Sequence, residues 1–218
     1  MRGLLAAMHK ELAPPFTDGE PLPAYSGLDL RMLDRQTVLC VCGVGKVNAA
    51  LAAQLLIDRF AVDELWNAGV SGSLREDPAG TLIAAEFCVQ HDLEIFGDPA
   101  GQVPVLERVD LPCAGAAETV ELLTAAGLPC RAGVVATGDW FGRDFPRAER
   151  IRDGFEADVC DMEAGAAAQV CLRAEVPFRC LKVVSDHVFH PSQYEEYQAN
   201  LPQAVRRLSE ALALLLGL

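Results

Sequence analysis

The sequence has no excess of positive charge. Its 218 residues contain 18 lysines and arginines against 31 aspartates and glutamates, so the formal net charge at pH 7 is −13. Nucleic acids and anionic membranes both attract basic surfaces, and this balance argues against either as a partner. The chain also lacks any uncharged apolar run of the ~18 residues that a membrane-spanning helix needs. We therefore expect a small-molecule or protein partner.

Disulfide and metal patterns are missing as well. Most of the eight cysteines lie inside apolar runs such as VLCVCGVG and FRCLKVV, as small hydrophobic residues do. The first residues contain too short an apolar stretch for a signal peptide, which favours reduced thiols in a cytoplasm. The four histidines form no HExxH motif, and the pair His187 and His190 lies beside Pro191, which disfavours a helical metal site. We expect no metal and no cofactor.

The glycine-rich stretch GVGKVNAA does not fit the common phosphate-binding motifs. A P-loop needs Gly at position 40 and a hydroxyl residue at position 47, where the chain has Cys40 and Val47. A dinucleotide-binding fingerprint needs a third glycine at position 48, which is Asn48. Two interpretations remain: a tight turn before a helix, or a turn that brings backbone close to a sugar or base.

Apolar strand-like runs alternate with helical patterns along the chain. Apolar residues of 47–60, for example, repeat with helical spacing on one face. Such alternation predicts an α/β fold with helices on both faces of a sheet, in a single domain over residues 1–218. Pro202 predicts a kink or an interruption in the last helical region, 194–218.

Polar or glycine-rich segments follow several of the predicted strands. In α/β folds, ligands bind at the carboxyl ends of the strands. The segments that we place there are Glu11, Gly43–Gly45, the Gly/Ser loop Gly69–Ser73, Thr137–Phe141, Asp161–Glu163 and Ser185–Asp186. Taken singly, Glu11 suits an exposed surface position, and Asp186 suits a helix N-cap as well as a general acid. Glu163 needs a partner, because burying an unpaired carboxylate is costly.

Seven stretches, in this order, resemble the nucleoside phosphorylase/nucleosidase superfamily, and most closely its 5′-methylthioadenosine/S-adenosylhomocysteine nucleosidases. They are AAMHKEL, GVGKVNAA, NAGVSGSL, HDLEIFGDPAGQVP, TGDWF, DMEAGAAAQVC and VVSDH. The resemblance implies a three-layer αβα sandwich around a mixed, largely parallel sheet and a homodimer. It also implies hydrolysis of the N-glycosidic bond of adenosine-type nucleosides, with water as the nucleophile.

The resemblance assigns the reaction to three acids. Glu11 would position and deprotonate the water, and Glu163 would hold the ribose hydroxyls, with Met162 packed under the sugar. Asp186, held by Ser185, would protonate N7 of the purine. The chemistry needs these residue types, because an acid must assist the leaving base while a carboxylate activates water on the far face of the sugar. The ribose, helped by the following helix N-terminus, is then the predicted partner of Glu163.

The resemblance also implies a set of substrate-binding residues. Phe141 would stack on the base, and Val44 and Tyr194 would line the same pocket. Pro104 would come from the neighbouring subunit to line the space for the 5′ substituent. Val70 stands where the family commonly has serine, so a polar contact is lost. The segments 91–101 and 186–194, which shape the pocket for the 5′ substituent, are shorter than usual in the family. The resemblance therefore does not decide which 5′ substituent the protein prefers.

Several alternatives remain. The related phosphorylases bind phosphate with arginines, and neither AAMHKEL nor NAGVSGSL contains one, which favours water as the nucleophile. A phosphate-dependent purine nucleoside phosphorylase is one alternative. An aminodeoxyfutalosine- or futalosine-type hydrolase of menaquinone synthesis is another, and a non-catalytic nucleoside-binding protein is a third.

Overall fold

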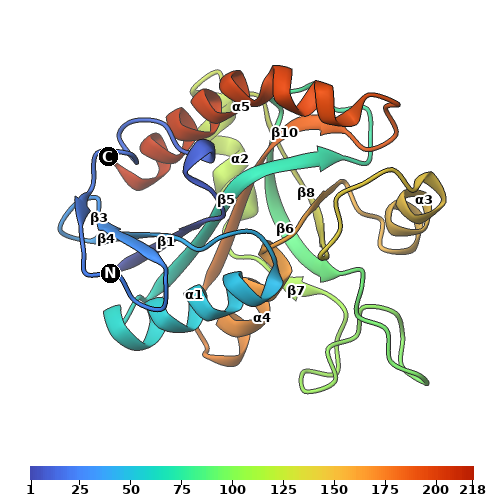
Figure 1. Ribbon diagram of the computed structural model, residues 1–218, viewed down its shortest axis with the longest axis horizontal. Helices are drawn as coiled ribbons and strands as arrows, with labels where there is room; N and C mark the ends of the chain where they lie inside the picture. The colour runs from blue at the N-terminus through green and yellow to red at the C-terminus, as the bar shows by residue number, and fades with distance from the viewer.

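The computed structural model describes residues 1–218 and confirms the α/β architecture (Figure 1). A ten-stranded mixed sheet forms its centre. The strands are β1 (Arg2–Ala6), β2 (Glu20–Pro21), β3 (Asp29–Met32), β4 (Thr37–Val41), β5 (Glu64–Ser73), β6 (Leu82–Gln90), β7 (Leu111–Pro112), β8 (Cys130–Thr137), β9 (Val159–Asp161) and β10 (Phe178–His187).

The sheet combines a closed part with an open wing. β5 is parallel to β10 and antiparallel to β9, while β8 is parallel to both β6 and β9. Because β6 also pairs antiparallel with β10, the strands β10, β6, β8, β9 and β5 close into a ring. β1 pairs in parallel with β5 and β4 and starts the wing, which β3 and β2 complete.

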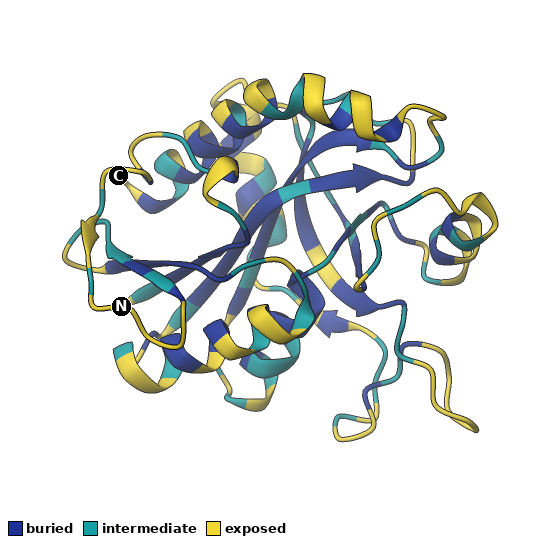
Figure 2. Cartoon of the chain, in the orientation of Figure 1, coloured by how far each residue is buried: buried dark blue, intermediate teal, exposed yellow.

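Helices cover both faces of the sheet (Figure 1). They are η1 (His9–Glu11, a 3-10 turn), α1 (Lys46–Phe60), α2 (Ala116–Ala125), α3 (Phe145–Gly154), α4 (Ala164–Arg173) and α5 (Gln193–Leu216). One core cluster joins α1 and α4 to the sheet, and a second joins α2 and α5 to its opposite face. Strands β1, β4, β5 and β10 are mostly buried, whereas β2 and β3 at the edge of the sheet are largely half-buried or exposed (Figure 2). None of the helices combines the length and apolarity required to cross a bilayer.

The α4 helix begins with small residues because it packs against the sheet at close range. Residues 164–168 are all alanine or glycine, and all are buried. A Cβ atom added to Gly165 would lie 3.0 Å from Cβ of Thr137 on β8, closer than ordinary packing allows. The start of α4 is thereby held against the end of β8, and this fixes the residues immediately before the helix.

The expectation that residues 69–73 form a loop is wrong. β5 continues through this segment because it is paired on both sides: Gly72 lies opposite Asp186 of β10 and Cys160 of β9. Pairing with neighbouring strands overrides the low strand propensity of glycine. A β-bulge between Val184 and Asp186 shifts the β10 register, and bulges of this kind redirect a side chain.

Of the two effects expected at Pro202, a kink or an interruption, the interruption is wrong. The α5 helix runs from Gln193 to Leu216 with Pro202 inside it. Proline removes one backbone N–H, which leaves the carbonyl of Gln198 without its intrahelical partner. Both residues are exposed, so water can satisfy that carbonyl and the helix can continue.

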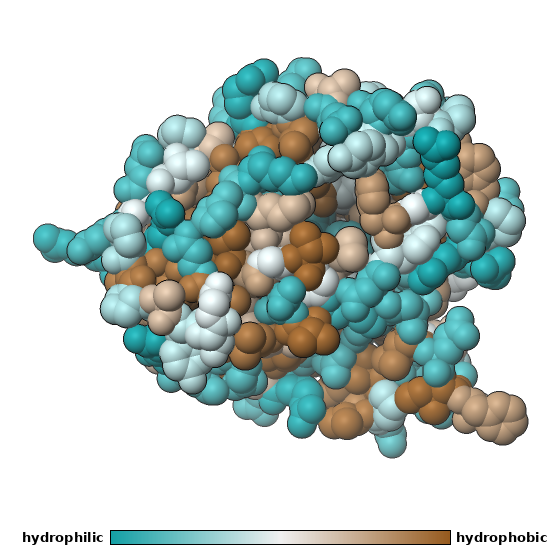
Figure 3. Space-filling view, viewed as in Figure 1, coloured by the Kyte–Doolittle hydropathy of each residue, from teal (hydrophilic) through white to brown (hydrophobic).

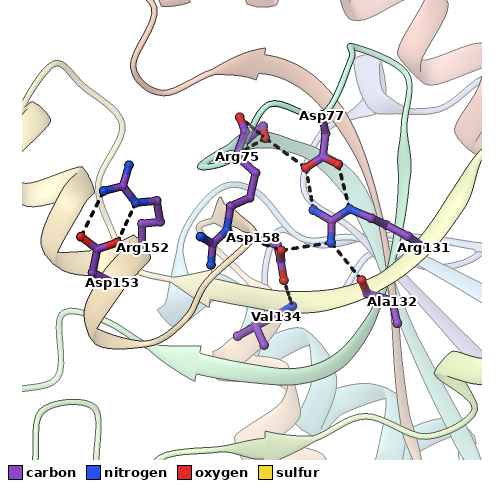
Figure 4. Close-up of polar contacts among 9 residues, drawn as sticks. Arg75, Asp77, Arg131, Ala132, Val134, Arg152, Asp153 and Asp158 are labelled. Atoms are coloured by element: carbon purple, nitrogen blue, oxygen red, sulfur yellow. Dashed lines mark hydrogen bonds and ion pairs between the residues drawn. The ribbon is translucent and has the colours of Figure 1, made fainter.

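A polar network holds the end of the sheet near α3 (Figure 4). Arg131 on β8 donates through Nε and Nη2 to the two carboxylate oxygens of Asp77, at 2.7 and 2.6 Å. Its Nη1 atom donates to Asp158 at 3.0 Å, and Asp158 also accepts the Val134 N–H at 2.8 Å. The network joins the loop after β5, strand β8 and the residue before β9.

We expect Arg131→Met to lower the free energy of unfolding by about 2 kcal/mol, because it leaves two partly buried carboxylates without their shared cation. Denaturant unfolding followed by circular dichroism measures this. Arg131 holds the pKa of Asp77 below its usual value, so the stabilisation is present at neutral pH and is lost as pH falls through that lowered pKa. Arg173→Met, at an exposed position of α4, is the matched control and should change nothing. Equal stability of the two variants would contradict the prediction.

Candidate active site

A cavity of about 280 Å³ is lined by residues that follow β1 and β9, by β5 and β10, and by the start of α5. Four carboxylates line it: Glu11, Asp161, Glu163 and Asp186. All four are buried, with exposed fractions of 4%, 7%, 7% and 1%. The structure therefore brings together the three acids singled out in the sequence, Glu11, Glu163 and Asp186, and adds a fourth.

Glu11 is held by backbone amides. It ends the 3-10 turn after β1, and its Oε2 atom accepts the Met8 N–H at 3.0 Å. Its Oε1 atom accepts a longer hydrogen bond, 3.4 Å, from the Val70 N–H of β5. Burial raises the pKa of this carboxyl group, and the charge of Lys182 opposes the rise. The alternative interpretation of Glu11 as an exposed surface residue is wrong.

Asp161 pairs with a buried lysine that the sequence analysis missed. Lys182 on β10 is 1% exposed, and its Nζ atom lies 2.7 Å from Oδ2 of Asp161. Oδ1 of Asp161 accepts a short hydrogen bond from the Thr137 hydroxyl. Its Oδ2 atom accepts the Ala164 N–H at 2.8 Å, so Asp161 caps the start of α4. Burial disfavours the charge of Lys182, but Asp161 outweighs this and keeps the lysine pKa raised.

Glu163 reaches the glycine-rich turn before α1. Its Oε1 atom accepts the Gly45 N–H at 2.9 Å. Gly45 has φ 104°, a conformation that favours glycine, so the turn can present its amide to the carboxylate. Burial raises the pKa of Glu163, the charge of Asp161 raises it further, and Lys182 lowers it. Of the two interpretations of GVGKVNAA, the tight turn before a helix is confirmed, because Gly45 directly precedes α1. Close approach of this backbone to a sugar or base stays a prediction.

Asp186 lies inside β10, at the bulge, and does not cap a helix. Its Oδ1 atom accepts the Ser185 hydroxyl at 2.6 Å, the contact expected from the sequence. Its Oδ2 atom accepts an N–H of the Gln193 side chain at 2.8 Å, which ties it to the first residue of α5. Burial raises the pKa of Asp186, and both hydrogen bonds oppose that rise.

The charge balance of the site favours proton transfer. The site holds four buried carboxylates and one buried cation beside them, Lys182, which pairs with Asp161. Burial raises the pKa of each of the remaining three acids. Carboxyl groups with raised pKa values can hold or release a proton near neutrality, as general acids and bases must.

A second network joins the Gly45 turn to the loop that carries Phe141. Oδ1 of Asp139 accepts the backbone N–H of Lys46 at 2.9 Å, and the Asp139 N–H donates to Asp92 at 2.9 Å. The Lys46 ammonium group in turn forms an ion pair with Asp92. The positions of Phe141 and of the Gly45 amide are therefore coupled.

The other residues expected from the sequence divide into two groups. Those that line the cavity are Val44, Val70, Phe141, Met162, Ser185 and Tyr194. Pro104 does not; it is exposed in the loop between β6 and β7. Lys10, Trp140, Gln193 and Tyr197 also line the cavity. Trp140 lies in the segment Thr137–Phe141 that the sequence placed there, and the other three were not predicted. Lys182 alone left a readable signal, because a lysine inside the apolar run FRCLKVV requires a buried acid.

Comparison with known proteins gives one consistent family. The model of the phosphorylase superfamily matches residues 26–216. The aminodeoxyfutalosine nucleosidase of Campylobacter jejuni is 31% identical over 206 residues, covering 88% of each chain. The 5′-methylthioadenosine/S-adenosylhomocysteine nucleosidase of Marinomonas sp. is 33% identical over 216 residues, covering 89% of this chain and 90% of its own. The crystal structure of the Helicobacter pylori 5′-methylthioadenosine/S-adenosylhomocysteine nucleosidase matches with a TM-score of 0.91 at 25% identity, covering 100% of this chain and 98% of that one.

Proposed function

Because this chain belongs to the phosphorylase superfamily, we propose that it is a nucleosidase that hydrolyses the N-glycosidic bond of 5′-substituted adenosines and releases adenine. Its expected substrates are of the 5′-methylthioadenosine and S-adenosylhomocysteine type. One observation carries the proposal: Glu11, Glu163 and Asp186 are buried around a single cavity with aromatic residues at its edge.

In this proposal Asp186 is the general acid. Adenine leaves readily only when N7 accepts a proton, so a protonated carboxyl group must face the base. Asp186 suits this role because burial raises its pKa and because Ser185 and Gln193 fix the orientation of both its oxygens. Phe141, exposed at the edge of the cavity, supplies a face on which the base stacks.

Glu163 holds the ribose. The Gly45 N–H donates a hydrogen bond to its Oε1 atom at 2.9 Å. The other carboxylate oxygen is free to accept hydrogen bonds from the sugar hydroxyls. Its negative charge also lies where positive charge develops on the sugar as the bond breaks, which stabilises the transition state. Met162 lies next to it in the cavity wall and packs under the sugar ring.

Glu11 activates the water. Two backbone amides, of Met8 and Val70, hold its carboxylate in one orientation. A fixed general base of this kind positions a water molecule for attack and accepts its proton as the bond to the sugar forms.

The cavity favours water over phosphate as the nucleophile. Its lining contains no arginine, and its one basic residue is Lys10. A phosphate ion would have to lie among four carboxylates without the bidentate cation that phosphate sites commonly use.

We therefore expect adenine release from 5′-methylthioadenosine to proceed in phosphate-free buffer, at a rate that added phosphate leaves unchanged. Chromatography of the products measures both the adenine and the sugar. The sugar should be free 5-methylthioribose. Release that depends on phosphate and yields a sugar 1-phosphate would show a phosphorylase instead.

A second substrate class follows from the comparisons. The Campylobacter jejuni relative is an aminodeoxyfutalosine nucleosidase that matches over 88% of this chain. The two substrate classes share the adenosine part and differ at the 5′ carbon. An aminodeoxyfutalosine-type substrate would therefore use the same three acids, and the 5′ end of the cavity decides between the two classes.

The exposed apolar residues support a homodimer. Val47 and Leu51 of α1 are exposed, as are Ile95, Phe96 and Val105 in the loop between β6 and β7. That loop projects from the body of the molecule (Figure 1), and apolar side chains gather on the surface around it (Figure 3). Pairing of two copies through this surface would bury these side chains and carry Pro104 toward the partner's cavity. The mass of the protein in solution, by sedimentation equilibrium, tests this arrangement.

A further inference from the structure

Lys10 differs from every other lysine of this protein. The chain has only three lysines, and two of them are paired: Lys46 with Asp92, and Lys182 with Asp161. Lys10 has no carboxylate partner, yet it lines the cavity one residue before Glu11. It is therefore an unneutralised cation at a site whose other charged lining residues are all acids.

Aromatic rings hold the Lys10 side chain in place. Its Nζ atom lies 5.1 Å from the centroid of the Tyr197 ring, within the range of a cation–π interaction. Tyr197 stacks in turn on Tyr194, with centroids 6.1 Å apart and planes at 24°. A hydrogen bond with Tyr197 raises the pKa of Lys10, so the ammonium group stays charged. The result is an apolar wall that ends in a fixed positive charge.

The position of this wall matches the 5′ end of a bound nucleoside. In the proposed binding mode, the base contacts Asp186, the ribose hydroxyls contact Glu163 and the water contacts Glu11, and all three acids are buried. The exposed lining residues of the cavity are Lys10, Val44, Phe141 and Tyr194. With Phe141 against the base, the 5′ carbon faces the other three. A substituent that extends from that carbon passes the tyrosines and reaches the ammonium group.

We infer that Lys10 selects substrates whose 5′ substituent ends in a carboxylate, an inference that rests on the proposed nucleosidase function. Without a local cation, the net charge of −13 and the four acids of the cavity would repel an anionic substituent. Lys10 offsets that repulsion at the one place where the substituent emerges. A neutral substituent, such as methylthio, gains nothing from this contact and loses nothing without it.

The test uses two adenosines that differ by one charge: 5′-deoxy-5′-(carboxymethylthio)adenosine and its neutral carbamoylmethylthio analogue. We expect the wild-type protein to prefer the carboxylate by about fivefold in kcat/KM, the effect of one partly solvated ion pair, and to lose the preference at high salt. Lys10→Gln should abolish the preference, and Lys10→Glu should invert it. Arg206→Gln is the matched control: it removes an exposed positive charge of α5 outside the cavity and should leave the preference intact.

The outcomes separate this inference from the proposal on which it rests. If wild type hydrolyses both analogues without preferring the carboxylate, or if Lys10→Gln retains the preference, the role of Lys10 is overturned and the nucleosidase function stands. If no adenine is released from either analogue or from 5′-methylthioadenosine, the proposed function fails, and the role of Lys10 fails with it.

Discussion

Replacing Asp186 with asparagine should lower kcat for adenine release by about 10³-fold, the contribution typical of a well-placed general acid. Asparagine has the same shape but cannot give a proton to N7. The asparagine carbonyl can still accept the hydrogen bond from the Ser185 hydroxyl. The Gln193 side-chain amide can rotate so that its carbonyl accepts a hydrogen bond from the new asparagine N–H. We therefore expect the affinity for 5′-methylthioadenosine to change by less than about threefold, because the binding contacts survive.

Steady-state kinetics give kcat, and calorimetric titration of the nearly inactive variant gives the affinity. The pH profile supplies a sharper control. The acid must be protonated, so activity is present below the pKa of Asp186 and falls as pH rises through it. Burial places that pKa above the usual value for aspartate, and the Asp186→Asn variant should lack this basic limb. Asp58→Asn, on the exposed side of α1, should behave as wild type. Undiminished hydrolysis by Asp186→Asn would remove Asp186 from the mechanism.

Replacing Glu11 with glutamine should cost a similar factor, about 10³-fold in kcat, because the amide cannot accept the proton of the attacking water. The structure around it should persist, since the glutamine carbonyl can keep the hydrogen bond from the Met8 N–H. Circular dichroism and the unchanged affinity for 5′-methylthioadenosine would establish this.

The base must be ionised, so Glu11 contributes to the acid limb of the kcat profile, together with Glu163, whose negative charge the reaction also needs and whose pKa is likewise raised. Activity is present above the pKa of Glu11, which burial raises, and is lost as pH falls through it. The Glu11→Gln variant should lose the Glu11 contribution to the acid limb and retain the basic limb. Glu20→Gln, an exposed position on β2, is the matched control. A Glu11→Gln variant with wild-type kcat would show that another group activates the water.

Much of the fold could be predicted because its signals are local. The repeat of apolar residues in 47–60 predicts α1, and the small residues after Glu163 predict the tightly packed α4. Acids placed directly after apolar runs indicate a shared edge of the sheet, and Glu11 and Glu163 do meet at one cavity. These inferences need only the period of a helix, the apolar character of buried strands and the cost of an unpaired carboxylate.

The remaining features depend on contacts between distant segments. Gly72 is part of a strand because β9 and β10 pair with it, and no nearby residue indicates that. Gln193 reaches Asp186 because α5 begins against the bulge of β10. Lys182 shows most clearly what can be read from sequence: its need for an acid is visible, but the choice of Asp161 over Glu163 becomes visible only in three dimensions.

The most direct test of the central claim is a crystal structure of the Asp186→Asn variant with 5′-methylthioadenosine bound. We expect N7 of the adenine at hydrogen-bonding distance, about 3 Å, from the side chain at position 186. The ribose hydroxyls should lie on Glu163, with a water molecule between Glu11 and the anomeric carbon. A nucleoside bound outside this cavity, or oriented with its base toward Glu11, would contradict the account.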